Sequence, residues 1–131
     1  MCNSEIYMNK IAIVMLTILL SACYNIEFDS LEYDRYVFLK QTADNGIKSC
    51  GSTTVVSVIN KLKQDTEHQF LYSFNRSDRP QIAEASAQLK DMVDRLYIQY
   101  QNKTPSLIYC QEKLINISTG TGKIIEQLGR F

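Results

Sequence analysis

The chain has 131 residues, of which 45% are hydrophobic and 21% charged, as in a single globular domain and unlike a disordered chain. Basic and acidic residues number 14 each, so the net charge is zero, which argues against nucleic acid as the main partner because phosphate binding needs an excess of Lys and Arg. The single His excludes multi-histidine metal sites, and we expect no metal ion and no cofactor.

An export signal is predicted at the start of the chain. Residues 11–20 form an uncharged apolar core that follows Lys10 and precedes the small residues Ser21 and Ala22. This arrangement is typical of a signal peptide, which we assign to residues 1–22. The core is too short to cross a membrane, since a spanning helix needs about 20 apolar residues.

The cleavage zone, Leu20-Ser21-Ala22-Cys23, resembles the lipobox of bacterial lipoproteins. In that family a lipid is attached to the Cys sulfur, the chain is cut before the Cys, and the new amine is acylated. The resemblance therefore implies lipidation of Cys23 and attachment to a membrane of the bacterial envelope. Tyr24 stands where Asp retains lipoproteins in the inner membrane, so the family rule favours the outer membrane, facing the periplasm. The alternative is an ordinary secretory signal with an incidental Cys.

The mature chain is divided into a lipidated tether over 23–30 and a helical domain over 31–131. Met8 is the expected true start, because residues 1–7 carry no basic residue and suit a signal peptide badly. Four acidic residues come before Arg35, the first basic residue of the mature chain: Glu27, Asp29, Glu32 and Asp34. We interpret this stretch as a solvated tether that leads into the first helix, and an acidic docking peptide is the alternative.

The first helix is expected over 30–49. The side chains assigned to its core-facing side are Leu31, Tyr36, Phe38, Leu39 and Ile47. The sequence Cys50-Gly51-Ser52 would end this helix.

Residues 53–75 fit either a helix or a strand. The helical stripe would consist of Val55, Ile59, Leu62, Thr66, Phe70 and Phe74. The β-branched residues of 53–59, and the alternation of Phe70, Tyr72 and Phe74, are typical of a strand. We favour the helix, because residues 60–69 are a polar run of helix formers.

Two further helices are expected, over 79–102 and 104–131. Their apolar residues recur at steps of three and four. The core-facing positions are Ile82, Ala85, Ser86, Leu89, Met92, Val93, Leu96 and Tyr100 in the first, and Leu107, Cys110, Leu114, Ile117, Thr121, Ile124 and Leu128 in the second. Asp78 and Thr104 are the predicted N-caps, with Gln81 as a capping-box partner and Pro105 as a first helical residue.

Four such helices with short connections predict an all-α, antiparallel bundle. Once Cys23 is lipidated, Cys50 and Cys110 remain, and an even pair in an oxidising compartment predicts a disulfide. In an up-down-up-down bundle the end of the first helix and the start of the fourth lie at the same end. The disulfide and the topology, inferred separately, are therefore compatible.

Catalytic motifs are weak throughout the chain. Residues 118–123 resemble a phosphate loop, but Ile117 replaces its first Gly and Ile124 replaces the Ser or Thr that follows the Lys. A catalytic pairing of a Cys with His68 has no supporting signature. We therefore predict that the protein is not an enzyme.

The function favoured by the sequence is protein binding. Tyr buries a large area and keeps a polar group, and it is enriched at interfaces, so Tyr72, Tyr97 and Tyr100 are the candidate partner-binding residues. In size and build the chain resembles secretion pilotins, entry-exclusion lipoproteins and toxin-immunity lipoproteins, although no family motif beyond the lipobox matches. The alternatives are an envelope enzyme or enzyme inhibitor, and a purely structural envelope lipoprotein.

Overall fold

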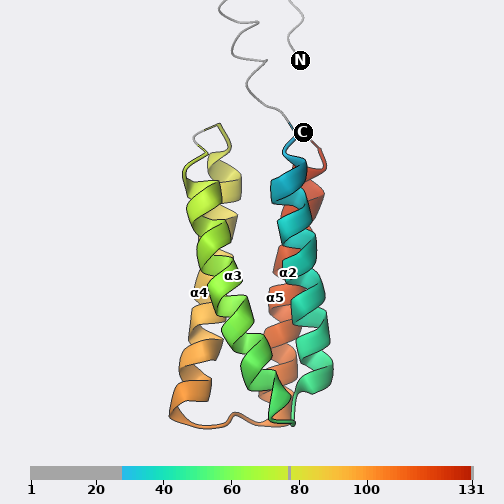
Figure 1. Cartoon of the computed structure of the whole chain (residues 1–131), viewed down its shortest axis with the longest axis vertical. Helices are drawn as coiled ribbons and strands as arrows, with labels where there is room; N and C mark the ends of the chain where they lie inside the picture. Colours follow the sequence, from blue (N-terminus) through green and yellow to red (C-terminus); the bar gives the residue numbers. More distant parts are fainter. Residues whose placement is uncertain (1–27, 77, 131) are drawn as a thin grey trace, which may run out of the picture.

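A computed structural model describes residues 28–76 and 78–130, and within them it contains four helices (Figure 1). They are α2 (Ser30–Ser49), α3 (Thr54–Phe74), α4 (Pro80–Asn102) and α5 (Leu107–Leu128). The predicted helical bundle is confirmed, and residues 54–74 are helical rather than a strand. The predicted signal peptide and Cys23 lie outside the described residues.

The four helices alternate in direction, and each packs against two neighbours. Helix α2 contacts α3 and α5, and α4 also contacts α3 and α5, so the helices occupy the corners of a square (Figure 1). One end of the bundle holds the start of α2, the α3–α4 connection and the end of α5, and we call it the proximal end. The other end holds the α2–α3 and α4–α5 connections, and we call it the distal end.

The core is built from one stripe of each helix. Its buried hydrophobic residues are Tyr36, Leu39, Ala43, Val55, Ile59, Leu62, Ile82, Leu89, Val93, Leu96, Cys110, Leu114, Ile117, Ile124 and Leu128. The predicted stripes of α4 and α5 agree with this core, except that Leu107 is 49% exposed at the first turn of α5. Ser86 is buried as expected for a small residue on the core-facing side of α4.

Two predicted stripes were wrong in part. On α2, Leu31 and Phe38 are about half exposed, and the buried stripe includes Glu32 instead. On α3, Phe74 is 64% exposed and the buried positions near its end are Gln69 and Ser73. The errors at Leu31 and Phe74 have one cause, because the true stripes continue there through polar residues that a search for apolar side chains passes over.

The predicted N-caps of α4 and α5 were also wrong. Helix α5 begins two residues later than expected, and its cap is Ser106, whose Oγ accepts a hydrogen bond from the backbone N–H of Tyr109 at 3.2 Å. Helix α4 begins at Pro80, where a missing N–H costs nothing, and it has no side-chain cap. Asp78 binds the guanidinium of Arg76 instead of capping the helix.

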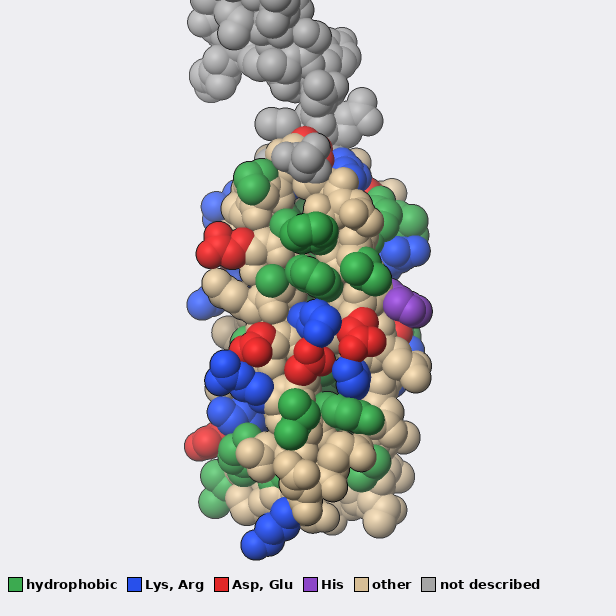
Figure 2. Space-filling view, turned by 90° about the vertical axis from the view of Figure 1, so that its left-hand side faces the viewer, with side chains coloured by type: hydrophobic (Ala, Val, Ile, Leu, Met, Phe, Trp, Pro, Cys, Tyr) green, Lys and Arg blue, Asp and Glu red, His purple; other side chains and the backbone are tan. Residues whose placement is uncertain are grey.

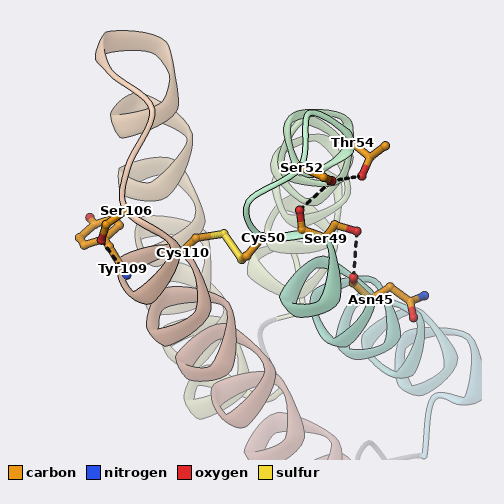
Figure 3. Close-up of a disulfide and its surroundings, with 8 residues drawn as sticks. All are labelled: Asn45, Ser49, Cys50, Ser52, Thr54, Ser106, Tyr109 and Cys110. Atoms are coloured by element: carbon orange, nitrogen blue, oxygen red, sulfur yellow. Dashed lines mark hydrogen bonds between the residues drawn. A yellow bond between two sulfur atoms is a disulfide. The ribbon is translucent and has the colours of Figure 1, made fainter.

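The predicted disulfide is confirmed. Cys50 and Cys110 are joined at the distal end, with their Cα atoms 5.9 Å apart (Figure 3). The bond links the end of α2 to the first turn of α5, two places that the up-down-up-down topology brings to the same end of the bundle. Gly51 follows with a φ of +86°, a backbone conformation that glycine adopts without strain, and it turns the chain into α3.

Candidate functional site

The three candidate tyrosines do not form one surface. Tyr72 lies in the last turn of α3 at the proximal end, whereas Tyr97 and Tyr100 lie in the distal half of α4. All three are half-buried. Tyr100 packs against the core, and burial raises the pKa of its hydroxyl. The ammonium group of Lys63 lies 5.1 Å from the ring centre of Tyr97.

The proximal end contains a buried ion pair that the sequence analysis missed. Glu32 of α2 and Arg79, the residue before α4, are 0% and 1% exposed, and their side chains form a salt bridge. Since α2 and α4 occupy diagonal corners of the square, this pair spans the diagonal of the bundle at its proximal end. The prediction that Glu32 belongs to a solvated stretch was wrong.

A chain of hydroxyl groups completes the surroundings of Glu32. Ser73 donates a hydrogen bond from Oγ to Glu32 Oε1 at 2.7 Å, so the Tyr36 hydroxyl, 2.9 Å away, donates to Ser73. Burial of Tyr36 raises the pKa of its hydroxyl and keeps it protonated as a donor. One carboxylate oxygen therefore accepts from α3 and the other faces the guanidinium next to α4.

Asp29 links this buried pair to the outer part of the proximal end. It caps α2 by accepting a hydrogen bond from the backbone N–H of Glu32 at 3.0 Å. Its other oxygen accepts hydrogen bonds from the Tyr72 hydroxyl and, at 2.8 Å, from Arg76. Partial burial raises the pKa of Asp29, but these hydrogen bonds and the positive charge of Arg76 outweigh it and lower that pKa on balance.

We call these side chains the proximal cluster: Asp29, Glu32, Tyr36, Tyr72, Ser73, Arg76, Asp78 and Arg79. A sequence signal for part of it exists, since Asp29 and Glu32 have the spacing of a capping box. Phe28 and Tyr33 also have the spacing of a hydrophobic staple, and their ring centres lie 5.5 Å apart. Because the ion pair at its centre is buried, the cluster fixes the position of α2 relative to α3 and α4.

The outer surface of α3 and α4 forms a second candidate site. A shallow groove of about 410 Å³ runs between the two helices near the proximal end. Its lining residues are Phe70, Phe74, Arg76, Pro80, Ala83, Glu84 and Ala87. Figure 2 shows the same face, with hydrophobic side chains in its proximal part. We call this surface the α3–α4 groove.

A band of charges borders the groove on its distal side (Figure 2). Lys63 of α3 contacts Glu67 at 2.6 Å and crosses to Asp94 of α4 at 3.5 Å, and Lys90 also contacts Asp94. Hydrogen bonding to Glu67 is the main cause of the raised pKa of Lys63. The band continues to Tyr97, so the face is apolar near the proximal end and charged in its middle.

In the described part of the chain, the residues considered for the enzyme alternatives are not brought together into a reactive site. Both Cys50 and Cys110 are in the disulfide, which removes the thiol that a pairing with His68 would need. His68 is exposed and lines a different groove, of about 380 Å³, between α2 and α3. Residues 118–123, which resemble a phosphate loop, are helical within α5. Over 28–76 and 78–130, no cluster of three or more potential metal ligands is present.

The chain matches no protein-family model, no curated protein and no solved structure. Among the described helices, none has the length and apolar character needed to cross a bilayer.

Proposed function

We propose that this protein is a lipid-anchored protein of the bacterial cell envelope that acts as a non-catalytic protein-interaction module on the periplasmic side. The anchor is the lipid on Cys23, and the sequence Leu20-Ser21-Ala22-Cys23 supports it. The Cys50–Cys110 disulfide also supports an exported location, because disulfides form and persist in oxidising compartments.

The observation that carries the binding role is the α3–α4 groove. Phe74, the more exposed of its two aromatic residues, is 64% exposed, and the small residues Ala83 and Ala87 line the α4 side of the groove. Exposed apolar patches with a polar rim mark protein-interaction sites, and here Arg76 and Glu84 provide the rim. The groove fits an apolar side chain or a short apolar segment of a partner protein.

Binding at this groove is tested by comparing two exposed hydrophobic residues on different faces. Phe74→Ser removes the most exposed aromatic of the groove, and Ile115→Ser changes a 48% exposed residue of α5 as the matched control. The domain over residues 24–131 and both variants are immobilised and exposed to envelope extract. We expect at least one protein that the wild type and Ile115→Ser retain equally, and that Phe74→Ser retains about fivefold less, as for an anchor residue worth about 1 kcal/mol.

Two results would contradict the proposal. Equal retention of every protein by all three forms would exclude the groove as the binding surface. The absence of any specifically retained protein would favour the purely structural envelope lipoprotein.

The anchor is tested separately. Mass spectrometry of the protein purified from membranes should show an acylated Cys23 as the first residue, and Cys23→Ser should leave the precursor unprocessed. A mature protein that begins at any other residue would exclude the lipoprotein assignment.

A further inference from the structure

The length of chain between the predicted lipid and the bundle limits how far the bundle can lie from the membrane. Phe28 follows Cys23 by five positions, and an extended chain spans at most about 3.6 Å per residue, so their Cα atoms lie within about 18 Å of each other. The polar layer of one leaflet is itself about 6 Å thick. The end of the bundle that carries Phe28 is therefore held next to the lipid headgroups.

That end presents apolar side chains to the outside. Phe28 is 47% exposed although its ring packs on Tyr33, and Leu31, in the first turn of α2, is 52% exposed. Tyr33 is half-buried and lies beside the end of α5, since a Cβ placed on Gly129 would be 3.8 Å from its ring. We call Phe28, Leu31 and Tyr33 the proximal patch.

We propose that the proximal patch docks on the bilayer that holds the lipid anchor, so that the start of α2 enters the interfacial layer and the disulfide end points away from it. This inference rests on the proposed lipidation of Cys23. The occupant is the lipid surface because no other surface is tied so closely to these residues.

The chemistry of the patch suits an interface. Tyr is enriched at the level of lipid headgroups, where an apolar ring and a polar hydroxyl are both accommodated. Arg130, just after α5 on the same end of the bundle, is 70% exposed and pairs with the exposed Glu126 at 2.7 Å, a carboxylate that a lipid phosphate would replace on docking. A patch of three residues is too small to bind a membrane alone, but the tether raises its effective concentration to the order of millimolar.

The proximal patch does not include the α3–α4 groove. The groove lies along the side of the bundle over α3 and α4, whereas the patch lies at the start of α2. Docking of the patch therefore leaves most of the groove accessible from the periplasm.

The absence of Trp in the natural sequence allows a direct test. Leu31→Trp places one reporter in the patch without touching the Phe28–Tyr33 contact, and Ile108→Trp places one at a 68% exposed site of the distal end. The acylated full-length variants are reconstituted in vesicles of phosphatidylethanolamine and phosphatidylglycerol, with and without brominated acyl chains. We expect about a twofold loss of fluorescence for Leu31→Trp and almost none for Ile108→Trp, because only the interfacial residue lies within reach of the bromines.

The possible failures are distinguishable. If the vesicle-bound protein shows equally weak quenching for both reporters, the docking proposal is wrong and the anchor remains. If the protein is not acylated and does not float with the vesicles, the anchor fails, and docking fails with it. Phe28→Trp serves as a second reporter in case Leu31→Trp is poorly folded, and quenching equal to that of Ile108→Trp would exclude docking by the same criterion.

Discussion

The two ends of the bundle are held together by different chemistry. At the distal end a covalent bond joins α2 to its neighbour α5, and the bonded cysteines need no help from charged groups. At the proximal end a buried ion pair, supported by hydroxyl groups, joins α2 to the residue before α4 on the diagonal corner. Helix α2 is therefore fixed at both ends, to α5 at the distal end and to the residue before α4 at the proximal end.

The difference shows what each kind of contact specifies. A disulfide stabilises chiefly by restricting the unfolded chain, so its effect depends mostly on the loop that it closes. A buried ion pair adds little net stability, because desolvation opposes attraction, but breaking it leaves an uncompensated charge in the core. The distal link thus increases stability, whereas the proximal link penalises any arrangement that separates Glu32 from Arg79.

The largest effect is expected when only one member of the ion pair is removed. Arg79→Met should lower the free energy of unfolding by about 3–5 kcal/mol, because Glu32 remains buried without its guanidinium. Urea unfolding of residues 24–131 measures this loss. The double variant Glu32→Met/Arg79→Met should recover much of it, and the exposed Arg95→Ala should change stability by less than about 0.5 kcal/mol. A loss below about 1 kcal/mol in Arg79→Met would mean that the buried charge is compensated elsewhere.

Removal of the distal link should have the next largest effect. The disulfide joins residues 60 positions apart, and the double variant Cys50→Ala/Cys110→Ala should lose about 2–4 kcal/mol, with about 4 kcal/mol as the loop-entropy limit. Wild-type protein in reducing buffer should unfold at the same urea concentration as this variant. Glu32 and Cys50 lie about 27 Å apart along the axis of α2. The stability losses from removing the ion pair and the disulfide should therefore add within about 0.5 kcal/mol. A clear departure from additivity would show that the two links act as one unit.

A pH-dependent effect is expected from Asp29. Its pKa lies below the ordinary value of 3.8, so the fold favours the charged carboxylate. The resulting stability is present above pH 3.8 and is lost as the pH falls through the lower, folded-state pKa. Asp29→Asn keeps a good N-cap, and it should cost about 1 kcal/mol at pH 7.

The difference between Asp29→Asn and wild type should shrink in acid, as measured by urea unfolding at several pH values. The exposed Asp91→Asn is the control and should show little difference at any pH. A difference for Asp29→Asn that stays constant down to about pH 2 would show that the charge has no role.

Two glycine substitutions test how closely the helices pack, one at Gly46 near the distal link and one at Gly120 farther along α5. A Cβ at Gly46, one turn before Cys50, would lie 2.9 Å from Val58 Cγ1 and 3.1 Å from Leu114 Cδ1. Gly46→Ala should therefore lose about 1–2 kcal/mol despite the better helix propensity of Ala. A Cβ at Gly120 would meet no atom from outside its own helix turn within 4 Å, and Gly120→Ala should gain about 0.5–1 kcal/mol. Thermal unfolding of both variants gives the comparison, and equal shifts would mean that the contact at Gly46 relaxes freely.

The sequence predicted the distal half of this comparison and missed the proximal half. Once the predicted signal peptide and the predicted lipidation of Cys23 are set aside, two cysteines remain, and they have one way to pair, so the bond required no knowledge of the fold. Glu32 and Arg79 carry charges, and every rule based on hydropathy assigns charged residues to the surface. Their burial depends on each other across the bundle, and that relation is absent from any local pattern.

The candidate sites show the same limit. The periodicity of three and four placed most core residues, because each helix buries one continuous stripe. The α3–α4 groove depends on which side chains of two helices oppose each other, and residues as far apart as Phe70 and Ala87 form it only after the helices pack. For α5 the sequence analysis predicted Thr104 as the cap, whereas the helix begins at Leu107 and its cap is Ser106.

The antiparallel order of the helices places the start of α2 and the end of α5 at the same end of the bundle (Figure 1). If Cys23 is lipidated as proposed, a reporter domain fused after Arg130 would emerge beside the tether and would be crowded between the bundle and the bilayer. The connection over 103–106 lies at the opposite end, separated by the length of α5, which is about 33 Å for its 22 residues. Under the same proposal, an epitope inserted in that connection would point away from the bilayer, so antibodies against the two positions would test the proposed orientation of the protein.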